Sequence, residues 1–174
     1  MNVIAFAASS STKSINKQLV TYASGLLVNA SIEILDLNDY ELPLFSEDKE
    51  AEIGQPPLAR KFFDKIGSSD AIIISFAEHN GSYSAAYKNL FDWCSRIDAK
   101  VFQNKPIVML ATSPGARGGS NVLAAATGSA PHFKGDLKGS LSVPNFYDNF
   151  DVDLGQIKTP ELKRQLEATV KSLE

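Results

Sequence analysis

The chain has 174 residues, of which 44% are hydrophobic and 21% are charged. These proportions fit one globular domain over residues 1–174 and exclude a disordered or collagen-like chain. The formal net charge is −3, and lysine and arginine never occur in a run longer than two. We therefore expect neither a nucleic-acid partner nor a membrane surface, since both normally require a basic patch.

Cysteine and histidine are too sparse for a disulfide or a metal site. Cys94 is the single cysteine, and His79 and His132 lie far apart in the sequence. No apolar run approaches the roughly 20 residues of a membrane span. The first residues are apolar but lack the basic segment that opens a signal peptide. Together with the lone thiol, these features favour a reducing, cytoplasmic location.

Short apolar runs alternate with amphipathic stretches along the chain. In chain order, the pattern predicts a strand at 3–8, a helix at 15–26, a strand at 32–37, a helix that begins at Pro57, a strand at 70–77, a helix at 83–97, a strand at 106–111, a helix at 121–127, a strand at 140–146 and a helix at 162–173. Five strands that alternate with helices predict a parallel α/β sheet with right-handed crossovers. Pro144 indicates that the last strand is an edge strand or carries a bulge. The acidic stretch 46–52 is interpreted as a solvated excursion, or less plausibly as a cover for a neighbouring subunit's site.

In open parallel sheets, ligands bind beyond the carboxyl ends of the strands. The loop 8–16, which follows the first strand, is rich in small hydroxyl residues and leads into a helix. Free backbone N–H groups, hydroxyl donors and the positive end of the helix dipole suit a phosphate, and Lys13 could add charge. A plain serine N-cap after a loop is the alternative. Neither a P-loop nor a G-x-G-x-x-G motif is present, so ATP and tight dinucleotide binding lack support.

Two further loops follow predicted strands at the same edge. Asn80-Gly81 lies in 76–83 and allows a tight turn with positive φ. This loop either lines a planar ligand or simply enters a helix, with Ser82 as N-cap. The loop 112–120 carries three glycines, a proline and an arginine, and it either approaches a ligand or is an ordinary surface loop. Together the three loops favour an anionic, planar cofactor, with its phosphate in the first loop and its ring between the other two.

At this point the motifs resemble those of the NADPH-dependent FMN reductase family. The matching residues are Ala8-Ser9 with Ser14 and Asn16, Glu78-His79-Asn80-Gly81-Ser82 with Lys88-Asn89 and Asp92-Trp93, and Ser113-Pro114-Gly115 with Gly118-Gly119. Their order and spacing follow the family from the first strand to the fifth. The resemblance implies a flavodoxin-like, three-layer α/β/α fold with a five-stranded parallel sheet of order 2-1-3-4-5.

The resemblance also implies FMN as the cofactor, with NADPH or NADH as hydride donor. The FMN phosphate would be held by Ser9, Ser11, Ser14 and Asn16. The isoalloxazine would lie beside Glu78, His79, Asn80 and Gly81, largely along their backbone, and the other side of the site would be closed by Ser113, Gly115, Arg117 and Gly118. Electrons would pass from NAD(P)H through the flavin to a quinone, azo compound, metal oxyanion or free flavin. The family further implies a homodimer or homotetramer, with the site near the subunit interface.

Four positions depart from the family pattern. Ala8 replaces a glycine, Ser11 an arginine, Ala77 a proline and His79 a tyrosine. The change at position 11 removes a guanidinium from the phosphate site. Whether FMN is a prosthetic group or a substrate therefore stays open. So do two alternative functions: a non-enzymatic flavin-binding electron carrier, and a family member that has lost flavin and acts as a binding or structural subunit.

The remaining marked residues are interpreted as structural. Flavin chemistry needs binding and orientation from the protein, so we expect neither catalytic side chains nor a metal. Phe91 and Trp93 are expected in a core or an interface, and Cys94 is expected to be inert packing. Asp92 is expected to cap or pair locally. Glu78 is interpreted as a surface carboxylate or, less plausibly, as one that bridges subunits.

Overall fold

A five-stranded parallel sheet forms the centre of the molecule, which a computed structural model describes over residues 1–174. The strand order is β2-β1-β3-β6-β7, and every neighbouring pair is parallel. The bounds are β1 Asn2–Ala8, β2 Ser31–Leu35, β3 Ala71–Phe76, β6 Pro106–Thr112 and β7 Asp136–Val143. Counted by sheet strands alone, this is the predicted order 2-1-3-4-5.

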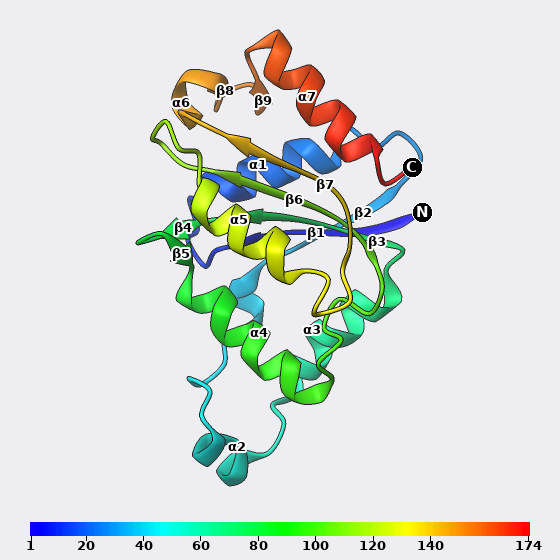
Figure 1. Ribbon diagram of the computed structural model, residues 1–174, viewed down its shortest axis with the longest axis vertical. Coiled ribbons are helices and arrows are strands. Elements are labelled where there is room, and N and C mark those ends of the chain that lie inside the picture. Colours follow the sequence, from blue (N-terminus) through cyan, green and yellow to red (C-terminus); the bar gives the residue numbers. More distant parts are fainter.

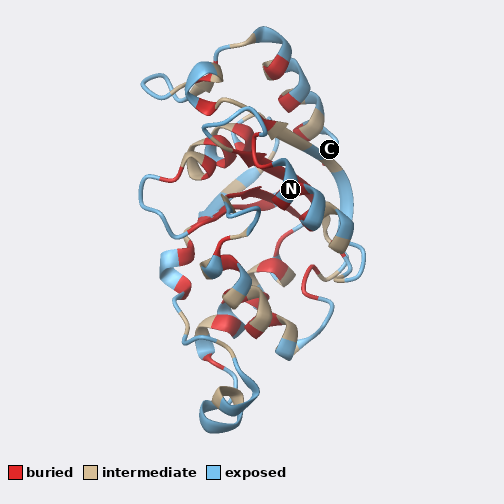
Figure 2. Cartoon of the chain, turned by 60° about the vertical axis from the view of Figure 1, so that its left-hand side comes forward, coloured by how far each residue is buried: buried red, intermediate tan, exposed pale blue.

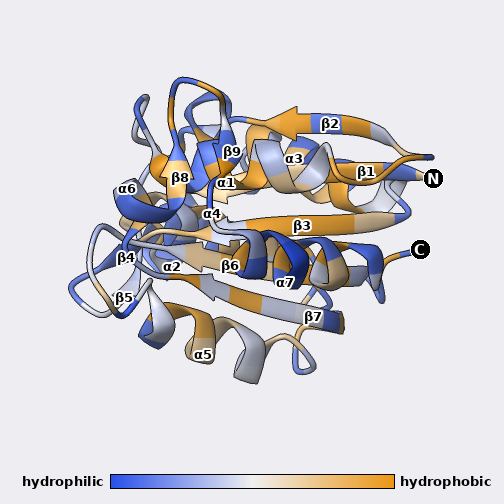
Figure 3. Ribbon diagram, turned by 90° about the horizontal axis from the view of Figure 1, so that it is seen from above, coloured by the Kyte–Doolittle hydropathy of each residue, from blue (hydrophilic) through white to orange (hydrophobic).

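The middle strand is the most apolar. Every residue of β3 is buried, and its register places Ile72 between Ile4 of β1 and Ile107 of β6. Such a run fits a strand that has packed layers on both faces. At the edge, β7 is largely exposed, and Figure 3 shows it paler than the strongly apolar β3.

The predicted last strand, 140–146, has the wrong bounds, although its position at an edge is confirmed. The strand runs from Asp136 to Val143. It ends because Pro144 has no N–H for the ladder and Asn145 adopts a left-handed conformation with φ 46°. The short helix α6, Phe146–Asn149, then begins.

Helices cover both faces of the sheet (Figure 1). One layer holds α1, Ile15–Ser24, and α7, Pro160–Lys171. The other holds α3, Pro57–Ser68, α4, Ala85–Ile97, and α5, Ser120–Ser129. The predicted helices therefore all form, and α3 begins at the expected proline. None of the helices is long and apolar enough to cross a membrane.

The sheet separates two apolar cores because successive strand residues point to opposite faces. Ile72 and Ile74 of β3 belong to the core under α3, α4 and α5, whereas Ile73 belongs to the core under α1 and α7. Figure 2 shows the buried residues concentrated in and against the sheet. Cys94 is in the first core, where burial raises the pKa of its thiol to about 12, so it is inert packing as expected. Trp93 is also fully buried.

The remaining elements are short. They are the 3-10 helix η1 Leu37–Tyr40, α2 Glu47–Ile53, the hairpin strands β4 Glu78–His79 and β5 Ser82–Tyr83, and the strands β8 Phe150–Asp151 and β9 Gln156–Ile157. The acidic stretch predicted as an excursion does project from the body (Figure 1), but it forms the helix α2. Ser46 caps this helix, and Glu50 pairs with Arg96 at 2.9 Å. No residue of α2 is buried, so the Ser46 cap and the Glu50–Arg96 pair, not apolar packing, stabilise the helix.

Candidate functional site

A cavity of about 240 Å³ lies at the carboxyl ends of β1, β3 and β6, where the three marked loops meet. It is lined by Ser9, Ser11, Lys13, Ser14, Ile15, Asn16, Ala77, Glu78, His79, Thr112, Ser113, Pro114 and Tyr147. Sequence-distant segments thus converge at the edge of the sheet where ligands of open α/β sheets bind. The cavity includes parts of all three predicted loops.

The loop between β1 and α1 presents polar groups to the cavity. Ser14 is the N-cap of α1, and its side chain accepts a hydrogen bond from Lys17 N. Ser9 Oγ accepts one from Ser11 N at 3.2 Å, which draws the loop into a turn. The backbone N–H groups of Thr12, Lys13, Ile15 and Asn16 make no hydrogen bond within the chain. These free donors stand at the positive end of the helix dipole.

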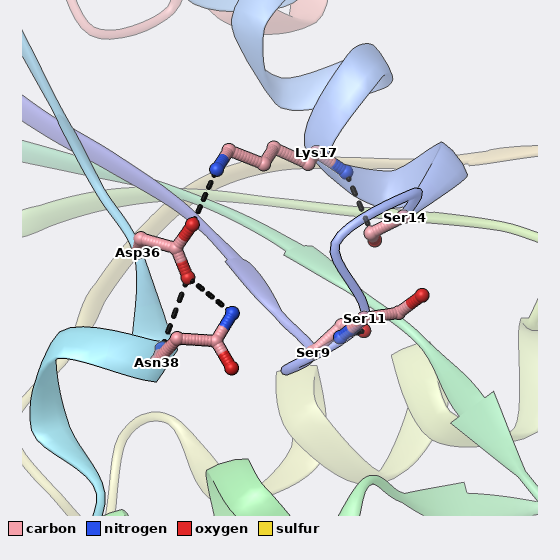
Figure 4. Close-up of polar contacts among 6 residues, drawn as sticks. All are labelled: Ser9, Ser11, Ser14, Lys17, Asp36 and Asn38. Carbon is pink, nitrogen blue, oxygen red and sulfur yellow. Dashed lines mark hydrogen bonds and ion pairs between the residues drawn. The ribbon is translucent and has the colours of Figure 1, made fainter.

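The two lysines near this loop have different roles. Lys17 turns away from the cavity and forms an ion pair with Asp36 at 2.5 Å (Figure 4). The Lys17 hydrogen bond, followed by one from the Asn38 backbone, holds the pKa of the Asp36 carboxyl below its usual value. Lys13 lines the cavity itself. The cation available to an anion in the cavity is therefore Lys13, because Lys17 is already paired.

The side chain of Asn16 joins the start of α1 to the ends of two strands, β3 and β6. Its Nδ2 donates to Thr112 O at 3.2 Å, and its Oδ1 accepts from Thr112 N at 3.1 Å and from Ser75 Oγ at 2.8 Å. The residue is 3% exposed. Asn16 thus lines the cavity while its side chain ties the start of α1 to β3 and β6. The structure gives this side chain a structural task that the phosphate prediction did not include.

The second loop is a tight hairpin, as the Asn80-Gly81 pair predicts. β4 and β5 pair antiparallel, and the turn residues have φ values of 51° and 79°. The helix N-cap, however, is Ser84 and not Ser82, whose place in β5 extends the hairpin by two residues. Ser84 also donates to Ala8 O at 2.8 Å, which anchors the hairpin beside the first loop.

The side chain of Glu78 is half-buried and bonded, so it is not the free surface carboxylate that the sequence favours. Its Oε2 accepts a hydrogen bond from Val122 N at 2.9 Å. The N-cap of α5 is Gly119, which has no side chain to serve this purpose. Glu78 therefore caps α5 from another loop, and its charge complements the helix dipole.

We expect Glu78→Ala to lower the free energy of unfolding by about 1 kcal/mol, because α5 loses both its capping acceptor and the favourable charge at its first turn. Chemical denaturation monitored by circular dichroism measures this loss. Glu78→Gln should lose less stability than Glu78→Ala, since the amide oxygen still accepts a hydrogen bond. Equal stability of the alanine variant and the parent would contradict the cap.

The third loop combines open and tightly packed glycines. A Cβ on Gly115 would meet no atom within 4 Å, whereas one on Gly118 would lie 2.4 Å from Ser142 Oγ and 2.8 Å from Pro144 N. Gly118 also has a φ of 56°. Ser113 O and Gly115 O accept hydrogen bonds from Phe146 N and Asn145 N, so the loop is fixed to the segment after β7.

The cavity brings together seven of the twelve predicted site residues, namely Ser9, Ser11, Ser14, Asn16, Glu78, His79 and Ser113. The other five do not line it. Asn80 and Gly81 form the hairpin turn, Gly115 and Arg117 are exposed on their loop, and Gly118 is packed against the end of β7. Tyr147 also lines the cavity, and the sequence does not reveal it, because it lies after β7 in a segment without a recognised motif. No group of three or more histidine, cysteine, aspartate or glutamate residues could hold a metal ion.

The fold and this three-loop site define a flavodoxin-like α/β protein, as the motifs predicted. Residues 1–141 match the sequence pattern of the NADPH-dependent FMN reductase family, and the chain belongs to this family. Among similar proteins, an NAD(P)H-dependent FMN reductase of Pseudomonas aeruginosa is 33% identical over 119 residues, which are 68% of this chain and 63% of that protein. A quinone reductase of Pseudomonas putida is 36% identical over 110 residues, 62% of this chain and 57% of that protein. The chain thus matches less than two thirds of the length of these relatives.

Solved structures of low sequence identity share the fold. FerB, a flavoenzyme NAD(P)H:(acceptor) oxidoreductase from Paracoccus denitrificans, superposes with a TM-score of 0.81 at 23% identity, covering 99% of this chain and 94% of that one. An FMN-dependent NADH-azoreductase from Bacillus anthracis, solved with FMN, gives a TM-score of 0.66 at 11% identity and covers 99% of each chain. The predicted flavodoxin-like architecture is therefore confirmed.

Proposed function

We propose that the protein is an FMN-dependent NAD(P)H oxidoreductase that transfers electrons to a small acceptor such as a quinone. The observation that carries this proposal is the single cavity in which the loops after β1, β3 and β6 converge. Family membership supports the choice of flavin. Without the family membership, the same cavity would indicate only an anionic ligand.

The first loop offers what an FMN phosphate requires. Four backbone N–H groups without internal partners, the Ser11 hydroxyl and the Lys13 ammonium surround the start of α1. A phosphate dianion is stabilised by such donors and by the helix dipole. Lys13 supplies positive charge on a loop that lacks the family's arginine. The residues present therefore fit the phosphate group of FMN.

The other two loops would position the ring and limit its access to water. Ala77 and His79 line one part of the cavity, and Ser113 and Pro114 line another, so the second and third loops both contribute to its wall. The Glu78–Val122 hydrogen bond holds the first of these segments, and the bond from Phe146 N to Ser113 O holds the second. When bound, FMN supplies hydride acceptance from NAD(P)H and electron release to the acceptor. The protein contributes rigidity and orientation.

Titration of the purified protein with FMN tests the proposal. We expect saturable quenching of flavin fluorescence and a perturbed visible absorption band. Under anaerobic conditions NADPH or NADH should bleach that band. Addition of a benzoquinone should then restore the band, as the quinone is reduced to the hydroquinone. Riboflavin, which lacks the phosphate, is the matched control ligand and should bind more weakly.

Two other outcomes would support the alternatives kept open by the sequence. Tight FMN binding without oxidation of either pyridine nucleotide would favour an electron carrier. Spectra that stay additive at saturating FMN would favour a family member that has lost flavin, and the absence of the arginine at Ser11 would then be the physical reason.

We extend the proposal to the setting in which the protein works. Residues 1–174 would act as one domain, in a homodimer or homotetramer, in the cytoplasm. The two cores that share one sheet support the first point. The buried, unpaired thiol of Cys94 is compatible with a reducing compartment. Light scattering of the purified protein at several concentrations would test the oligomer.

A further inference from the structure

One wall of the cavity comes from outside the family-matched residues 1–141. Tyr147 lies on α6, directly after β7, and it lines the cavity. The residue is 59% exposed, and its hydroxyl has no hydrogen-bond partner within the chain. This exposed phenol is a free hydrogen-bond donor at a cavity suited to an anion. Neither the motifs nor the family pattern assigns a role to it.

The backbone of this segment is held firmly although the Tyr147 side chain is free. Asn145 N donates to Gly115 O at 3.0 Å, and Phe146 N donates to Ser113 O at 3.1 Å. On the other side, Lys158 Nζ donates to Tyr147 O at 3.0 Å. The segment is therefore fixed both to the third loop of the site and to the region that precedes α7, so the position of Tyr147 is set by the fold.

The neighbours of Tyr147 pack its segment against α1. Phe146 and Phe150 belong to the same core as Leu19 of α1, and the Phe150 ring meets Tyr22 of α1 edge-on at 6.0 Å. The segment thus packs on the α1 side of the sheet, as Figure 1 also shows. Tyr147 and the first loop, which carries the unpaired N–H groups, therefore line the same cavity.

We propose that Tyr147 is a binding residue that donates a hydrogen bond from its hydroxyl to the phosphate of the bound ligand. The inference rests on the proposed function, because it assigns a further partner to the phosphate of FMN. Ser11 leaves this site without the guanidinium that the family pattern carries there, and Tyr147 adds a donor from a different part of the chain. A phenol hydroxyl bonds well to a charged oxygen acceptor.

Removal of the single hydroxyl tests this assignment. We expect Tyr147→Phe to weaken FMN binding by about ten- to a hundredfold, the range of one hydrogen bond to a charged group. Riboflavin affinity should stay unchanged, because riboflavin carries no phosphate. Fluorescence titration measures both ligands. Tyr83→Phe is the matched control, since the Tyr83 hydroxyl faces Ser129 and neither of these two residues lines the cavity.

Each other result would count against the assignment. If the parent protein binds FMN and oxidises NAD(P)H while Tyr147→Phe binds FMN equally well, the assignment is wrong and the proposed function stands. An equal loss for FMN and riboflavin would indicate a ring contact in place of a phosphate contact. If the parent does not bind FMN, the proposed function fails. Thermal stabilisation by inorganic phosphate then tests whether Tyr147 contacts an anion. A stabilisation that Tyr147→Phe lowers supports the anion contact, and an unchanged or absent stabilisation overturns it.

Discussion

Asn16→Ala is expected to lower the free energy of unfolding by about 3 kcal/mol. The substitution leaves the Ser75 hydroxyl and the Thr112 N–H buried without a partner, and each such orphaned group costs about 1–3 kcal/mol. The three hydrogen bonds of Asn16 connect residues that are 59 and 96 positions apart. Urea denaturation monitored by circular dichroism should therefore show an earlier midpoint.

The same variant separates two roles for Asn16. Asn121→Ala is a suitable control, because Asn121 is exposed on α5 and a surface change of this kind stays within about 0.5 kcal/mol. Unchanged stability of Asn16→Ala combined with weaker FMN binding would contradict the structural role and favour a ligand contact. A clear loss of stability supports the role that the hydrogen bonds indicate.

Gly118→Ala is the second change with a large expected effect, a loss of about 3 kcal/mol in the free energy of unfolding. Two penalties combine at this position. A residue with a Cβ is strained at a φ of 56°, and the new carbon would collide with backbone atoms of Val143 and Pro144 at the end of β7. Strain and overpacking each cost about 1–3 kcal/mol. Thermal unfolding of the variant measures their sum.

Gly115→Ala is the matched control within the same loop. Gly115 does not have a positive φ, and an added Cβ would meet no atom within 4 Å, so the stability should change little. Similar losses for both variants would contradict the packing argument. Any effect of Gly115→Ala on FMN affinity alone would indicate that a ligand approaches this glycine.

The sequence predicts the sheet well wherever the strands are continuously apolar. β1, β3 and β6 are buried throughout or nearly so, and the runs that predict them end within two residues of the observed bounds. The predicted bounds of β7 are wrong because polar residues interrupt the strand: Asp136 and Lys138 flank the exposed Leu137 at the edge. α2 has no apolar period, because none of its residues is buried.

The site was predictable as a set of loops but not as a set of contacts. Small and turn-forming residues mark each loop, and their common edge follows from the parallel sheet. The pairing of Glu78 with Val122 joins positions 44 residues apart, and no local pattern encodes it. The place of Tyr147 depends on how the segment after β7 folds back on α1. Such long-range packing becomes visible only in three dimensions.

The order in which the two cores are completed has a consequence for synthesis of the chain. The core under α3, α4 and α5 has its full set of elements once α5 is made, whereas the other core needs Leu162, Leu166 and Val170 of α7. About 60 residues separate the end of β6 from the end of α7, which at 5–20 residues per second is an interval of roughly 3–12 s. During that interval this core lacks the three apolar side chains that α7 contributes to it. The nascent protein therefore carries an incomplete apolar core late in translation, when a chaperone would have most to protect.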